Sequence, residues 1–310
     1  MKAGAACRLL LLVCLATPAL AFDLNGILDT AKRVAEAVKP AATQHDEAAQ
    51  EKLIGEQAAL EILSKAPLAP LPRLQRYVNQ VGRYIAAKSD RSALDWRFAV
   101  IDDASANAWA APDGYIFITT GMLTDIDSEA ELAGVLAHEI EHIVQHHYLK
   151  AIKAANTRAE LGKLADIAKD AAHVSTSTLD SQLQALRGSI GVLYARGLDR
   201  GDELDADRRG VELAGKAGYD PYGLPLVLQK LGARGKDDAS LAVFTRTHPS
   251  IEDRLEKLEP VIEALDPRYF PGRTLEERYR QFAKFQAIAA GGAAPFPFLR
   301  PLPAGITSAR

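Results

Sequence analysis

Cysteine is nearly missing from this chain, and what there is lies at one end. Of its 310 residues, only Cys7 and Cys14 are cysteines. A disulfide framework is therefore excluded for the rest of the chain. A strong charge of either sign is also lacking. The net charge of −3 argues against nucleic acid as a partner.

Long apolar runs are missing after residue 21, so the sequence predicts no membrane-spanning helix there. Residues 1–21 have the pattern of a secretory signal peptide, with Lys2 and Arg8 before an apolar stretch and an A-x-A cleavage site at 19–21. We expect cleavage there and a periplasmic mature protein. A lipid anchor at Cys14 is disfavoured because bulky Val13 precedes it.

One motif carries most of the chemical information. Residues 138–142 read HEIEH within an apolar, proline-free stretch, and Ser128 with Glu131 is typical of a helix start. In a helix, His138 and His142 would share one face and could bind the same zinc ion. Glu139 would flank the metal and act as general base. The alternative, an exposed helix with two incidental histidines, is disfavoured by the apolar neighbours.

A catalytic zinc ion needs a third protein ligand. A histidine six residues beyond His142 is excluded because Tyr148 stands there. Glu203 is the candidate on a later helix, and Asp207 four residues on would share its face and accept a ring N–H from a ligand histidine. The residues alone leave open an exposed, salt-bridged helix, because three arginines lie nearby: Arg200, Arg208 and Arg209.

Two further histidines follow the motif. His146 lies about 12 Å along the helix axis from His138, too far for both to bind one zinc ion. We interpret His146 and His147 as structural residues or as supports of the ligands.

Four segments together resemble the HtpX-like family of zinc metallopeptidases, the gluzincins that also include the CAAX prenyl proteases. In chain order they are NAWAAPDG at 107–114, VLAHEIEH at 135–142, ELDAD at 203–207 and THPSIEDR at 247–254. The resemblance extends from about Lys52 to Leu258. Glu141 is a departure, because the family often has glycine there.

The resemblance implies an α+β fold that is mostly helical, a compact gluzincin domain with a small sheet whose edge strand lines the zinc cleft. It implies one Zn²⁺ per chain with Glu139 as base, held by three ligands: His138, His142 and Glu203. Asp207 would support a ligand histidine.

The resemblance also places His248 and Arg254 near the active site. His248 would either donate to the oxyanion of the tetrahedral intermediate or occupy the fourth zinc position at rest.

Alternating patterns predict strands at 96–101 and 115–119. The segment between them, with Asn107, Ala108, Trp109 and Ala110, would be the edge strand, to which an extended peptide adds by main-chain hydrogen bonds. The alternative is an ordinary hairpin loop.

The predicted organisation is a signal peptide at 1–21, a helical segment at 22–45, a metallopeptidase domain at 46–288 and a flexible tail at 289–310, rich in proline, alanine and glycine. Within the domain, residues 151–198 form a helical insertion. It is either a lid or a plain helical hairpin.

The sequence thus predicts a zinc endopeptidase of the bacterial periplasm, acting on misfolded or unassembled envelope proteins. A periplasmic chaperone or assembly factor that binds extended chains with little turnover is the alternative. An aminopeptidase lacks a motif to hold a free α-amine. Longer relatives that assist outer-membrane β-barrel assembly carry tetratricopeptide repeats, and none is recognisable here. Contact with that assembly machinery remains a possible partnership.

Overall fold

The structure is a computed structural model that describes residues 44–155, 188–235 and 237–283. Residues from Ala48 onward form one compact unit, while those up to Glu47 belong to a second unit of which only 44–47 are described. The predicted signal peptide, most of segment 22–45, the middle of insertion 151–198 and the tail lie outside the described residues. None of the described helices is long and apolar enough to cross a bilayer.

The small sheet has three strands, in the order β1-β3-β2. β1 (Arg97–Ile101) runs parallel to β3 (Tyr115–Thr119), and β2 (Ala108–Ala111) runs antiparallel to β3. The two strands predicted from alternation are therefore present, and β2 is an edge strand as the family resemblance implied. Gly114 has a φ of 88°, the left-handed conformation that the turn between β2 and β3 requires.

The central helix is α5 (Glu129–Val144), and every one of its residues is buried. The Ser128 hydroxyl accepts a hydrogen bond from the Glu131 N–H, as the predicted helix start requires. The Glu131 carboxylate accepts from the N–H of Asp127 rather than from that of Ser128. This end of α5 is therefore closed by a variant of the capping box.

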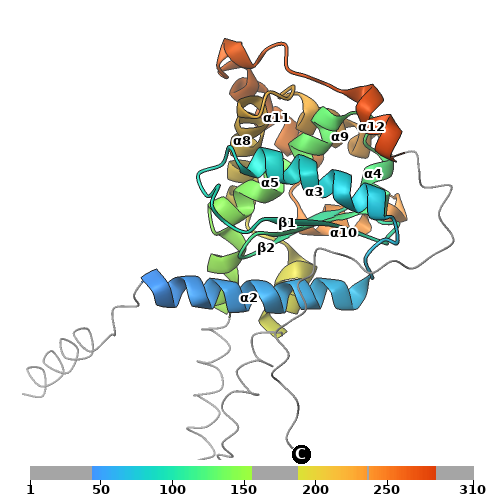
Figure 1. The fold of residues 1–310 in the computed structure, drawn as a ribbon. Helices are drawn as coiled ribbons and strands as arrows, with labels where there is room; N and C mark the ends of the chain where they lie inside the picture. Colours follow the sequence, from blue (N-terminus) through green and yellow to red (C-terminus); the bar gives the residue numbers. More distant parts are fainter. Residues whose placement is uncertain (1–43, 156–187, 236, 284–310) are drawn as a thin grey trace, which may run out of the picture. The chain divides into compact units, whose positions relative to one another are not determined.

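Helices cover the sheet in layers. α3 (Pro72–Ala86) packs on β1, and α5 packs on β2 and against α3. Beyond α5 lie α8 (Arg200–Lys216), α9 (Gly223–Ala233) and α11 (Ile251–Glu263), as Figure 1 shows. The described part is thus mostly helical with one small sheet, which confirms the predicted fold class.

α8 crosses α5 at a very short distance because of a glycine. A Cβ on Gly210 would lie 3.0 Å from the Cα of His138. Only a residue without a side chain allows this approach. The crossing places the first turns of α8, with Glu203 and Asp207, beside the histidines of α5.

The remaining elements complete the unit. They are α2 (Gln44–Lys65), α4 (Thr120–Thr124), α10 (Ala242–Thr247), α12 (Glu276–Ala283) and two short 3₁₀ helices at Ala239–Leu241 and Pro267–Tyr269. The sequence did not predict α4 or α10. α2 begins at Gln44, so the predicted division between residues 45 and 46 falls inside this helix.

Candidate metal centre

Three side chains from two helices converge where α5 and α8 cross. His138 and His142 come from α5 and Glu203 comes from α8. The two Nε2 atoms lie 3.0 Å apart, and each lies 3.7 Å from an oxygen of Glu203. All three residues are buried, with Glu203 fully inaccessible to solvent. They form the group in the described part of the chain that could hold a metal ion.

These separations fit a tetrahedral zinc site. Ligands at about 2.0–2.1 Å from one zinc ion, at tetrahedral angles, lie about 3.3 Å from each other. The two Nε2 atoms lie 3.0 Å apart, a little less than that value. His138 Nε2 lies 3.7 Å from Glu203 Oε2 and His142 Nε2 lies 3.7 Å from Glu203 Oε1, a little more than that value. One oxygen of Glu203, Oε1, is buried without a hydrogen bond, as a ligand atom facing a cation would be. The residues present therefore fit the metal.

The outer nitrogen of His138 is held by a buried ion pair. Its Nδ1 lies 2.9 Å from Asp207 Oδ1. Arg254 binds the same carboxylate through Nε at 2.8 Å and Nη2 at 2.6 Å. Although burial favours the protonated acid, the Arg254 guanidinium outweighs it and holds the pKa of Asp207 below its ordinary value. Asp207 thus lies between His138 and Arg254 and contacts both, while the role predicted for it stays a prediction.

The outer nitrogen of His142 has one of the two histidines that follow the motif as its partner. His147 Nδ1 lies 3.1 Å from His142 Nδ1, and the His147 side chain is buried. The neighbouring His146 is half-exposed and its Nδ1 lies 3.8 Å from Glu51 instead. The two adjacent histidines, equivalent in sequence, therefore have different surroundings.

Glu139 lies beside the triad formed by His138, His142 and Glu203, and it is almost completely buried. Burial, together with the nearby carboxylate of Glu203, raises the pKa of Glu139 well above its ordinary value. The main-chain N–H of Ala110 donates to the Glu139 carboxylate, while Glu139 Oε2 has no hydrogen-bond partner. A carboxylate of raised pKa with one free oxygen can accept a proton and return it.

Burial also sets the charge of the two histidines. It lowers the pKa of His142 well below its ordinary value and lowers that of His138 as well. Both rings are therefore neutral at pH 7, the form that binds a metal. Burial alone would raise the pKa of Glu203, but His248 and the two neighbouring histidines lower it by more. The pKa of Glu203 therefore lies below its ordinary value, and its carboxylate is charged.

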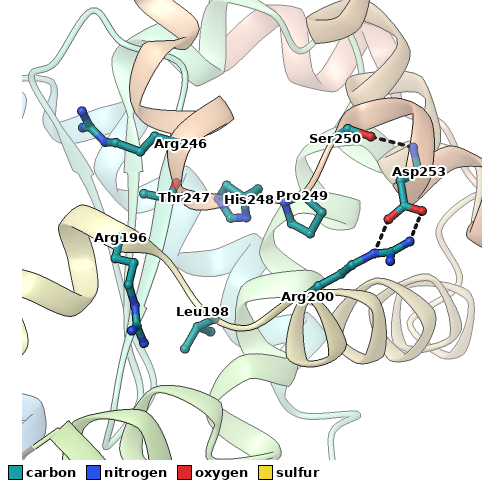
Figure 2. A pocket seen from close by; sticks show the side chains of 9 residues that line it. All are labelled: Arg196, Leu198, Arg200, Arg246, Thr247, His248, Pro249, Ser250 and Asp253. Carbon is teal, nitrogen blue, oxygen red and sulfur yellow. Dashed lines mark hydrogen bonds and ion pairs between the residues drawn. The ribbon is translucent and has the colours of Figure 1, made fainter.

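His248 reaches the triad from the segment between α10 and α11. Its Nδ1 lies 2.5 Å from Glu203 Oε2, and its ring packs against Phe244. His248 also lines an open pocket of about 500 Å³. Figure 2 shows the walls of this pocket, formed by residues 246–250 and by residues 196–200, and the ion pair between Arg200 and Asp253 of α11. The open pocket therefore reaches His248, which contacts Glu203.

A second, smaller pocket, lined mostly by apolar residues, borders the acid–base groups. Its lining includes Glu139, His248 and Arg254 together with apolar residues of α5, α9 and α10. The Arg254 Nη1 group is buried and has no partner in the described part of the chain. This nitrogen is thus a free hydrogen-bond donor close to Glu139.

The edge strand presents main-chain groups to the same region. Asn107 O accepts from Thr119 N, so in the antiparallel β2–β3 ladder residues 107, 109 and 111 are bonded to β3, and Ala108 and Ala110 face outward. Consistent with this, Ala110 O accepts a hydrogen bond from the Tyr194 hydroxyl at 2.7 Å. The Asn107 side-chain amide is fully buried, and neither its oxygen nor its nitrogen has a hydrogen-bond partner among the residues that the structure describes.

α8 has two different faces, and both interpretations of its charges apply. Asp205 pairs with Arg208 and Arg209 on the outer face, as in the salt-bridged alternative. Glu203 and Asp207 are buried on the inner face. On α5, Glu141 accepts from Gln145 and makes no contact with the triad, so the departure from the family pattern does not touch it.

Comparisons with known proteins agree with this geometry. The sequence profile of peptidase family M48 matches residues 72–262, which is more than half of the chain. The β-barrel assembly-enhancing protease of Yersinia pestis is 27% identical over 252 residues, covering 79% of this chain and 49% of that protein. The mitochondrial metalloendopeptidase OMA1 of Schizosaccharomyces pombe is 32% identical over 212 residues, covering 67% and 60%. The chain thus spans about half the length of the first of these relatives.

Proposed function

The chain belongs to peptidase family M48, and on that basis we propose that it is a zinc-dependent endopeptidase. The observation that carries the proposal is the convergence of His138, His142 and Glu203. Their side-chain atoms are as far apart as the ligands of one zinc ion would be, and Glu139 lies beside them. A zinc ion held there supplies a Lewis acid that acidifies water and polarises a carbonyl group.

In this mechanism Glu139 carries the proton. It takes a proton from the attacking water and later passes it to the leaving amine. The raised pKa of Glu139 suits the first step, since a stronger base accepts the proton more readily. The Ala110 N–H orients the carboxylate by its hydrogen bond. The unpaired Arg254 Nη1 is a donor for the oxyanion that forms on the carbonyl.

The substrate would be an extended polypeptide that adds to β2. The outward-facing main chain of Ala108 offers it hydrogen bonds. The Ala110 N–H is already bonded to Glu139, but the Ala110 carbonyl can join once the Tyr194 hydroxyl is displaced. Main-chain recognition of this kind is broad in sequence. The unpartnered amide of Asn107 lies at the start of the same strand. Trp109, whose main chain pairs with Phe117 of β3, would keep the edge in register.

The test uses the purified chain and an unfolded substrate such as casein. We expect about one zinc ion per wild-type chain and cleavage at internal sites. Glu139→Gln should keep the metal, because Glu139 is no ligand, and lose about 10²–10⁴-fold in turnover. If wild type with zinc never cleaves, and both proteins bind unfolded chains equally well, the chaperone alternative is correct instead.

The two roles of His248 make opposite predictions. If it donates to the oxyanion, His248→Ala loses turnover. If it blocks the fourth metal position at rest, the same variant gains turnover. The 2.5 Å contact with Glu203 puts the ring within reach of either position. Initial rates of casein cleavage, with zinc content measured on the same samples, separate the two.

We further propose the periplasm as the location and misfolded or unassembled envelope proteins as substrates. The leader pattern of residues 1–21 supports the first, and the name of the relatives, β-barrel assembly-enhancing protease, supports the second. In a bacterium that makes the Glu139→Gln variant, we expect a mature chain beginning at Phe22 in the periplasmic fraction and accumulation of its substrates. A full-length chain in the cytoplasm would contradict this.

A further inference from the structure

A histidine that gives one ring nitrogen to a metal needs an acceptor for the N–H on its other nitrogen. That acceptor fixes the tautomer and the orientation of the ring, and it raises the basicity of the ligand. For His138 the acceptor is Asp207, at 2.9 Å from Nδ1. For His142 the sequence left open whether His146, His147 or neither is the acceptor, although this ring is fully buried and could not be held by solvent.

The structure places His147 at that position. Its Nδ1 lies 3.1 Å from His142 Nδ1, and the two rings meet edge to face with 74° between their planes. His142 must keep a lone pair on Nε2, the atom that faces Glu203. The proton of His142 is then on Nδ1 and is donated to Nδ1 of His147, so that His147 carries its own proton on Nε2.

Helix α8 stabilises this tautomer of His147. The His147 Nε2 atom lies 3.7 Å from Asp202 and 3.8 Å from Asp205, within reach of one bridging water or a small side-chain shift. These two carboxylates flank Glu203 in the sequence of α8. Helix α8 therefore carries Glu203, the proposed metal ligand, and also the two aspartates that lie near His147.

We propose that His147 is a positioning residue for the metal centre, holding His142 in the ligand tautomer and orientation through the Nδ1–Nδ1 hydrogen bond. The inference rests on the proposed zinc site. In this proposal His147 accepts the outer N–H of His142, just as Asp207 accepts the outer N–H of His138. His147 does not touch the metal or the substrate.

The residue before His147 provides a matched control. His146 is one residue away, has a φ of 59° and a half-exposed side chain, and lies near Glu51 rather than His142. Asparagine tolerates that left-handed backbone. His146→Asn therefore removes a histidine from the same turn without removing a partner of a ligand.

The experiment measures zinc affinity by competition with a chromophoric chelator, for the full mature chain. His147→Leu removes the acceptor while filling the space, and we expect a loss of about 10–100-fold. His147→Asn returns an oxygen to the place of Nδ1 and should recover most of the affinity, while His146→Asn stays near wild type. Cobalt(II)-substituted protein should show a changed visible spectrum only in His147→Leu.

Equal zinc affinity in His147→Leu and wild type would overturn the proposal. If the leucine variant does not fold, His147→Asn is compared with His147→Gln, whose oxygen reaches the place of Nε2 instead. The asparagine variant should bind zinc more tightly, and equal affinities would again contradict the proposal. A wild-type protein that binds no zinc would instead refute the proposed function itself.

Discussion

At the scale of single residues, the same ion-pair geometry occurs twice in this protein with different surroundings. Arg254 and Arg200 each approach an aspartate through Nε and Nη2, Arg254 to Asp207 and Arg200 to Asp253. The Arg254 side chain is 2% exposed, whereas that of Arg200 is 63% exposed. Solvent screens the outer pair and leaves the inner one as a strong local charge.

We therefore expect Arg254→Met to destabilise the protein strongly. It leaves Asp207 buried without its counter-charge, which costs roughly 3–5 kcal/mol. Zinc affinity should also fall, because Asp207 loses the group that orients it toward His138. Arg200→Met is the matched surface control and should change neither quantity appreciably. Thermal melting and chelator competition on both variants check this. Equal effects of the two variants would show that burial is not the deciding factor.

At the scale of elements, helix 188–196 already occupies part of the β2 edge. The Tyr194 hydroxyl donates to Ala110 O, an outward-facing carbonyl of the edge strand. The Tyr194 ring stacks on Tyr148, which in turn contacts the His142 ring. A peptide that adds to β2 at this carbonyl must therefore displace the hydroxyl first.

From this competition we predict that Tyr194→Phe lowers the KM for an unfolded substrate. A net hydrogen bond is worth about 0.5–1.5 kcal/mol, or roughly 2–10-fold in affinity. Tyr279→Phe serves as control, because its hydroxyl donates to Leu123 O at the same 2.7 Å but away from β2. Steady-state kinetics on casein-derived peptides measure both. An unchanged or higher KM in Tyr194→Phe would mean that substrate does not use this carbonyl.

At the scale of the whole molecule, one buried carboxylate joins distant parts of the chain. Glu129, at the start of α5, is fully buried and accepts hydrogen bonds from Tyr77 of α3 and from Tyr219 after α8, each at 2.7 Å. Arg278 of α12 pairs with the same carboxylate. Partners up to 149 residues from Glu129 in the sequence are thereby fixed around the start of the helix that carries His138 and His142.

This cluster makes the protein sensitive to alkali. Burial raises the pKa of Tyr219 from its ordinary value of 10.0 to about 12. The folded state therefore keeps a proton that the unfolded state loses above pH 10. The contribution of Tyr219 to stability is complete below pH 10 and is lost as the pH rises toward 12.

Melting temperatures measured from pH 8 to pH 12 should therefore fall in the upper half of this range. In Tyr219→Phe the fall should be shallower, because one of the protons responsible is absent, although the variant starts from a lower stability. Tyr222→Phe is the control, since Tyr222 is 48% exposed and its ring packs on Phe270 rather than on Tyr219. A fall of the same steepness in all three proteins would rule out Tyr219 as a cause.

The sequence by itself determined the features that depend on local spacing. The four-residue interval between His138 and His142 fixes both rings on one helix face, the Ser128 cap fixes where that helix begins, and alternation fixes β1 and β3. With the family resemblance it also pointed to Glu203, 61 positions after His142. The structure shows that His138, His142 and Glu203 lie beside each other, while the roles of these residues remain predictions.

Only the tertiary structure decided which groups meet across helices. Nothing in the sequence distinguishes His147 from His146, because both follow the motif in one turn, and only the packed structure shows that His147 lies beside His142 and α8 while His146 lies near Glu51. The same holds for Arg254 and Tyr194, whose partners Asp207 and Ala110 lie 47 and 84 residues away. Periodicity specifies directions within one element, whereas contacts between elements depend on how the whole core packs.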